Sequence, residues 1–137
     1  AEQQCRSLGI CEHVHFMGKW KRVEDILSIA DLFLIPSGSE TFGLAALEAM
    51  SCSVPVISSD IGGLPEVNIH GETGYACSLD DVTCMADYAA QILSTPSLHA
   101  TLAKNARKRA ELFNQDYVVR QYEDFYEEVL ARSIKRI

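Results

Sequence analysis

The sequence predicts an α/β fold, a Rossmann-like parallel sheet with flanking helices. Three observations support this prediction. The chain has 137 residues, the size of one domain that can bury a single core. Short apolar strand-like runs alternate with helical patterns, which is typical of parallel strands joined by helical crossovers. From Leu79 onward the pattern is helical throughout. We therefore treat residues 1–137 as one domain.

Along the first half of the chain, strands and helices are expected in turn. The opening stretch AEQQCRSLGI has a helical composition and no initiator Met, which suggests a piece of a longer protein. Strand candidates are β-branched or aromatic runs between turn signals. They are VHFMG (14–18), LFLIP (32–36), PVISS (55–59) and GYAC (74–77). Between them, apolar residues at helical spacing predict helices over 23–30, 41–50 and 64–71.

Three helices are expected to complete the chain. The first covers 80–94, the second covers 96–113 with Pro96 near its start, and the third covers 115–133. The aromatic residues of the third helix recur at helical spacing, which indicates packing.

The composition argues against several classes of protein. With 12 Lys and Arg against 19 Asp and Glu, the net charge is −7, which disfavours a nucleic-acid binder or a generic binder of anionic membranes. Peripheral membrane contact remains open. No run approaches the roughly 20 apolar residues that span a bilayer. The five cysteines form no CxxC motif, so we expect them to act as small hydrophobes in a reducing, cytoplasmic compartment.

The segment SGSETFGLAALEAM (37–50) carries the main functional signal. It follows the strand 32–36, at the sheet edge where α/β proteins bind ligands. A turn into a helix at Thr41 to Gly43 would direct unpaired amides and the helix dipole at that edge, forming an anion site. Gly43 permits close approach of a phosphate. Because the helix is apolar except for Glu48, we expect it to be packed on all sides, where a carboxylate needs a partner.

The spacing of Glu40 and Glu48 fits a ligand with two hydroxylated ends. Along a helix, eight residues at ~1.5 Å each separate them by about 12 Å. This matches a diphosphate with a sugar at one end and a ribose at the other, since carboxylates accept hydrogen bonds from hydroxyls. In the alternative interpretation Glu40 only complements the helix dipole and Glu48 pairs with a Lys or Arg.

Other motifs are absent or incomplete. Gly38 and Gly43 have P-loop spacing, but Leu44 and Ala45 follow where Lys and Ser or Thr are required. There is no GxGxxG, because the paired glycines Gly62 and Gly63 follow a different strand. His13 and His15 lack a third ligand, so no metal site is expected.

The stretch SETFGLAALEAMSCSVPVISSDIGGLPEVNIHGETGY (39–75) resembles the E-x7-E region of the retaining glycosyltransferases of family 4. Their usual form is ESFGLxxLEAMACGxPVIxxxxGGxPEVxxxGxTGxL. Members have the GT-B architecture, with two Rossmann-like domains and the active site between them. The resemblance implies that this chain is an incomplete C-terminal domain of a GT-B glycosyltransferase, which binds a nucleotide sugar. Ser53 departs from the pattern, since the family has Gly at this helix C-cap position.

The resemblance also implies roles for single residues. Glu40, the catalytic candidate, would contact hydroxyls of the donor sugar, and Glu48 would bind the ribose. The loop after HFMG would lie near the nucleobase. The implied donor-binding residues are Glu40, Thr41, Phe42, Gly43, Leu44, Glu48, Gly18 and Lys19. No metal and no cofactor other than the UDP-linked donor are expected.

The implied function is transfer of a hexosyl group from a UDP-sugar to an acceptor hydroxyl. Residues 15–44 are most similar to the N-acetylglucosaminyl malate synthases within the family, which suggests GlcNAc as the sugar. The partners would be the donor, the acceptor and a missing N-terminal domain. Two alternatives are a non-catalytic nucleotide-sugar-binding or interaction module and a nucleotide-sugar epimerase.

The family pattern makes the four strand candidates strands 3 to 6 of the order 3-2-1-4-5-6. Without strands 1 and 2, the edge of strand 4 is left uncovered. We therefore expect residues 14–18 to be detached, paired with another chain or paired beside 32–36, and the polypeptide to self-associate.

Overall fold

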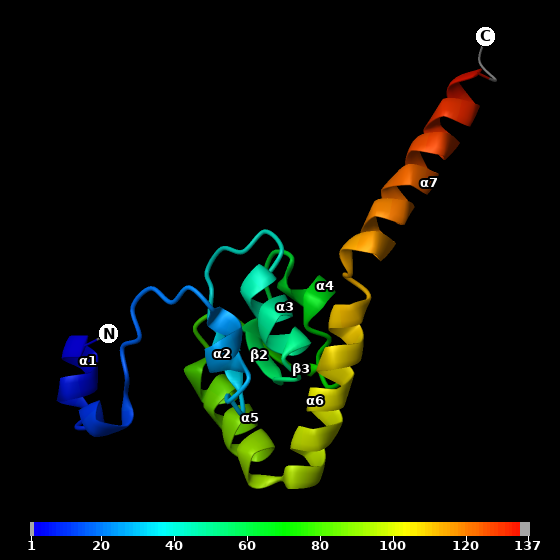
Figure 1. Ribbon diagram of the computed structural model, residues 1–137. Helices are drawn as coiled ribbons and strands as arrows, with labels where there is room; N and C mark the ends of the chain where they lie inside the picture. The colour runs from blue at the N-terminus through cyan, green and yellow to red at the C-terminus, as the bar shows by residue number, and fades with distance from the viewer. Residues whose placement is uncertain (1, 135–137) are drawn as a thin grey trace.

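The computed structural model describes residues 2–134 and has the expected α/β fold (Figure 1). The elements in chain order are α1 (Glu2–Ser7), a 3-10 helix (Cys11–His13), α2 (Val23–Leu27), β1 (Phe33–Ile35), α3 (Leu44–Ser51), β2 (Val56–Ser59), α4 (Leu64–Val67), β3 (Gly74–Cys77), α5 (Val82–Ser94), α6 (Pro96–Glu111) and α7 (Gln115–Ile134). Every predicted helix is present, although α2 and α4 end earlier than expected.

The sheet has three parallel strands in the order β1-β2-β3. Phe33 lies opposite Val56, and Val56 lies opposite Gly74. The sequence predicted the same order for the strand candidates 32–36, 55–59 and 74–77. All four residues of the central strand β2 are buried, as expected for a parallel strand covered on both faces.

The two faces of β2 support separate hydrophobic clusters. Val56 packs with residues of α2, α3, α4 and α6, including the fully buried Met50 and Leu64. On the opposite face, Ile57 packs with residues of β3, α5 and α6. Because α6 contributes to both clusters, it connects the two layers and holds the end of α3 against the sheet.

A buried polar network lies beside β3. The Nδ2 group of Asn68, which is 1% exposed, donates to the Ser58 hydroxyl at 2.9 Å and to the Tyr75 carbonyl at 3.1 Å. Its Oδ1 atom accepts from the Thr73 hydroxyl at 2.9 Å. Both ends of the buried amide are therefore satisfied, and the network ties the turn after α4 to β2 and β3.

The turn after α3 contains Ser53, the departure from the family pattern. Its φ is +63°, and its amide donates to the Met50 carbonyl at 2.9 Å. The next amide, of Val54, donates to Ala49 at 3.0 Å. This is a left-handed C-cap, a position where glycine avoids the steric cost of a Cβ atom.

The strand predicted over 14–18 is wrong. These residues have no strand assignment, and Phe16 and Met17 are 55% and 49% exposed. Figure 1 shows the segment between α1 and α2 running apart from the sheet. A strand requires a hydrogen-bonding neighbour, and β1 has only β2 beside it in the described part of the chain. Of the arrangements expected for this segment, the structure has the detached one.

The prediction that the cysteines act as free small hydrophobes is also wrong for two of them. Cys77 at the end of β3 and Cys84 in the first turn of α5 form a disulfide, with their Cα atoms 6.1 Å apart. That separation lies within the range that a disulfide bridges. Cys5, Cys11 and Cys52 are free thiols. The cytoplasmic location remains a prediction.

Helix α7 projects away from the rest of the domain (Figure 1). Its apolar side chains are largely solvent-exposed, including Tyr122 at 59% and Phe125 at 58%. The helix therefore lacks the packing that its aromatic spacing predicts. Among residues 2–134, none of the helices combines the length and hydropathy needed to cross a bilayer.

Candidate functional site

Three loops meet at the carboxyl edge of the sheet. The first, residues 36–43, joins β1 to α3, the second joins β2 to α4, and the third follows β3. A Cβ atom on Gly38 of the first loop would lie 3.8 Å from the Leu79 side chain of the third. The amide of Gly63 in the second loop donates to the carbonyl of Glu40 at 3.2 Å. The first loop is thus supported by both of the others.

Glu40 lies on the first loop, just before α3, and is half-buried. Its Oε1 atom accepts hydrogen bonds from the amides of Phe42 at 3.4 Å and Gly43 at 3.2 Å. Both distances are at or beyond the long end of the usual range, so the carboxylate is held weakly. In this position the carboxylate complements the positive end of the α3 dipole, which is the alternative interpretation of Glu40 given by the sequence.

Gly43 explains why α3 begins later than predicted. Its φ of +96° is outside the helical region, so the helix starts at Leu44 rather than at Thr41. A Cβ atom here would also lie 2.9 Å from the Leu64 side chain. In the described part of the chain, the amides of Leu44 and Ala45 make no intramolecular hydrogen bond. These free donors, at the positive end of α3, are suited to an anionic group.

Glu48 lies on the outer face of α3 and is exposed. Leu44 on the same face is 65% exposed, whereas Ala46, Ala49 and Met50 are buried against the core. The prediction of a helix packed on all sides is therefore wrong, because α3 buries one face in the core and exposes the other. No ion pair of Glu48 is seen among residues 2–134, so neither a buried partner nor a cation accounts for it. Its carboxylate is free to accept hydrogen bonds from a ligand.

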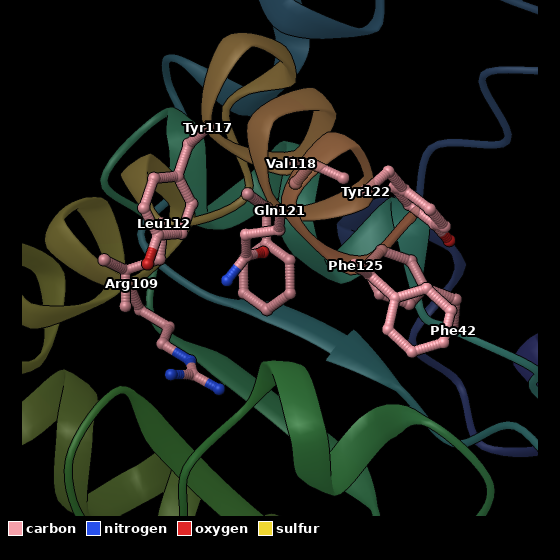
Figure 2. Close-up of a pocket in the computed structure, with 9 residues that line it drawn as sticks. Phe42, Arg109, Leu112, Tyr117, Val118, Gln121, Tyr122 and Phe125 are labelled. Atoms are coloured by element: carbon pink, nitrogen blue, oxygen red, sulfur yellow. The ribbon is translucent and has the colours of Figure 1, made fainter. Parts of the chain in front are cut away.

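The side chain of Phe42 anchors the first loop on the turn between α6 and α7. Its ring packs edge-on against Phe113, with 5.6 Å between ring centroids. Arg109 lies over the other ring of this pair, 5.2 Å from the Phe113 centroid, and its guanidinium donates to the carbonyl of Glu66. Phe42 and Phe125 of α7 both line a groove of about 590 Å³, and Figure 2 shows the side chains that line it. The amide of Phe42 therefore belongs to the polar site, and its ring belongs to an apolar one.

Sequence reasoning missed Gly62 and Gly63. We considered this pair only as a failed dinucleotide motif, yet it packs directly on the backbone of Glu40 to Phe42. A glycine pair after a buried strand was the available signal, because adjacent glycines mark a close approach between backbone segments.

Gly18 and Lys19 lie on the exposed segment between α1 and α2 (Figure 1). Their role near a nucleobase stays a prediction. Among the described residues, no three His, Cys, Asp or Glu side chains are grouped in a way that could hold a metal ion. Whether a metal is needed is likewise still a prediction.

The chain is similar in sequence to known glycosyltransferases. Residues 1–109 match the family described as glycosyl transferases group 1. N-acetyl-alpha-D-glucosaminyl L-malate synthase of Bacillus anthracis is 43% identical over 129 residues, which are 93% of this chain and 34% of that protein. A D-inositol 3-phosphate glycosyltransferase of Rhodococcus erythropolis is 37% identical over 114 residues, which are 82% of this chain and 26% of that protein. The chain thus spans about a third or less of the length of these relatives.

Solved structures agree on the fold. The sucrose-phosphate synthase of Thermosynechococcus elongatus is similar with a TM-score of 0.85 and 34% identity, over 96% of this chain and 34% of that one. Anabaena Alr3699/HepE in complex with UDP is similar with a TM-score of 0.87 and 26% identity, over 93% of this chain and 35% of that one. The same protein has also been solved with UDP and glucose.

Proposed function

The chain belongs to the glycosyl transferases group 1 family, and from this membership we propose that it is the donor-binding part of a retaining glycosyltransferase. The donor is a UDP-linked hexose, GlcNAc, and the acceptor is a hydroxyl compound. The acceptor is bound mainly by a further domain of the protein. The similarity to a protein solved with UDP and to an N-acetylglucosaminyl transferase supports this choice of donor.

One observation carries the proposal. The loop that holds Glu40 turns into α3 at the carboxyl edge of the sheet, with free amides at Leu44 and Ala45 and an exposed carboxylate at Glu48. The amides suit the distal phosphate, and Glu48, farther along the helix, suits the ribose hydroxyls.

Glu40 has to change partners for this function. Its carboxylate accepts from the amides of Phe42 and Gly43 in the structure. A phosphate binding at the start of α3 would compete for these amides, and the released carboxylate could then accept hydrogen bonds from the sugar hydroxyls. Transfer would be assisted mainly by preorganised amide dipoles that stabilise the leaving diphosphate.

Calorimetry on the full-length protein tests the donor. We expect UDP and UDP-GlcNAc to bind and ADP-glucose to bind much more weakly. Incubation with an acceptor should release UDP, and proton NMR of the product should show the anomeric configuration of the donor. Conversion of the UDP-sugar without an acceptor would indicate an epimerase instead. Binding without turnover over a broad acceptor panel would favour a binding module.

A further inference from the structure

The turn after β2 contacts the loop of Glu40 residue by residue. The amide of Gly63 donates to the Glu40 carbonyl at 3.2 Å. Gly62 faces Glu40, Gly63 faces Thr41 and Phe42, and Leu64 faces Gly43. The two segments are about 20 residues apart in the sequence, so this contact exists only because β1 and β2 are neighbours in the sheet.

The contact leaves no space for a side chain. A Cβ atom on Gly62 would lie 1.8 Å from the Glu40 carbonyl oxygen. A Cβ atom on Gly63 would lie 2.3 Å from the Thr41 carbonyl oxygen and 2.8 Å from the Phe42 Cα atom. All of these neighbours are backbone atoms, so a rotamer change cannot relieve the clash. Any larger residue must displace the loop or the turn.

We propose that Gly62 and Gly63 are positioning residues that set where the carboxylate of Glu40 meets the donor sugar. This inference rests on the proposed function. The glycine pair and Leu64 contact the backbone of the loop. The ring of Phe42 packs on Phe113, in the turn after α6. The Glu40 side chain is the part that remains free to exchange its two weak hydrogen bonds for sugar hydroxyls.

The chemical reason is the sensitivity of transfer to geometry. A displacement of a catalytic group by about 1 Å lowers a rate by roughly 100-fold. Glu48 lies about one turn into α3, and the atoms nearest to a Cβ atom on Gly62 or Gly63 all belong to residues 40–42. Displacement of the loop should therefore reduce the rate of transfer much more than it reduces nucleotide affinity.

The test compares Gly62→Ala with the matched control Gly71→Ala in the full-length protein. Both glycines have a left-handed backbone, with φ of +55° and +78°, so alanine strains both. Only Gly62 faces the loop, because a Cβ atom on Gly71 would have nothing within 4 Å. We expect Gly62→Ala to lower kcat by roughly 100-fold with a much smaller change in the Kd for UDP, and Gly71→Ala to keep both values.

Gly63→Ala provides a second test that remains available if Gly62→Ala does not fold. Its φ of −84° suits alanine, so only the contact with Thr41 and Phe42 changes. The ratio of UDP-GlcNAc affinity to UDP affinity should fall in this variant, which a general loss of stability would not cause. A wild-type kcat in the folded Gly62 or Gly63 variants, or an equal loss in Gly71→Ala, overturns the inference. If the wild-type protein itself does not bind UDP, the proposed function fails instead.

Discussion

Replacing Glu48 with alanine should weaken UDP binding without weakening the fold. The carboxylate is exposed and forms no ion pair in the described part of the chain, and alanine is the better helix former. We therefore expect the free energy of unfolding to change by no more than about 0.5 kcal/mol. Hydrogen bonds to a charged group contribute about 1.5–3 kcal/mol. Loss of the ribose contact should raise the Kd for UDP by about 10- to 150-fold.

Glu40→Ala should behave in the opposite way. Its carboxylate accepts from two amides at the start of α3, so its loss should lower the free energy of unfolding by about 0.5–2 kcal/mol, as for an N-cap. UDP affinity should not fall, because the competing carboxylate is gone, whereas sugar transfer should fall strongly.

The assay is calorimetry with UDP and with UDP-GlcNAc on the full-length protein, combined with urea unfolding of each variant. Glu72→Ala is the control for the change in net charge, since Glu72 is exposed on the turn before β3, away from the carboxyl edge. If Glu48→Ala and the wild type bind UDP equally, the assignment of Glu48 to the ribose is refuted.

Four further predictions concern stability and assembly. Asn68→Ala should lower the free energy of unfolding by about 3 kcal/mol, because buried partners on β2 and β3 lose their hydrogen bonds; a loss below about 1 kcal/mol in urea would contradict this. Ser53→Gly should raise the free energy of unfolding by about 1 kcal/mol, because it removes the Cβ atom from a residue with a left-handed backbone. An unchanged value would show that the strain is negligible. Thiol titration should find three reactive cysteines in the unfolded, unreduced chain and five after reduction. Breaking the Cys77–Cys84 bond should lower the free energy of unfolding by about 2–3 kcal/mol. Five thiols before reduction would show that the bond is absent in solution. Light scattering of the 137-residue chain should show concentration-dependent association through the free edge of β1, and a monomer at all concentrations would refute it.

Much of the fold could be predicted from local patterns. The runs at 32–36, 55–59 and 74–77 became β1, β2 and β3, because β-branched and apolar residues between turn signals favour buried parallel strands. The long helices α5, α6 and α7 followed from apolar spacing and, for α6, from Pro96 at its first position. The E-x7-E stretch identified the family, which the match over residues 1–109 confirmed.

The sequence also located the segment of the candidate site, but the tertiary structure decided how its residues are placed. Glu48 was expected in a packed helix and is exposed, because α3 buries only one face against the sheet and its neighbouring helices. Glu40 was expected to face a ligand, and its carboxylate accepts from the amides of its own loop.

Pairing between distant segments accounts for the remaining differences. Residues 14–18 have the composition of a strand, but among residues 2–134 they have no neighbour to complete a ladder. The glycines at 62 and 63 acquire their contact with Glu40 only because β1 and β2 lie side by side. The Cys77–Cys84 bond depends in the same way on how β3 turns into α5. Local propensity determines whether a segment can form a strand or helix, whereas its neighbours in space determine whether it does and what its side chains touch.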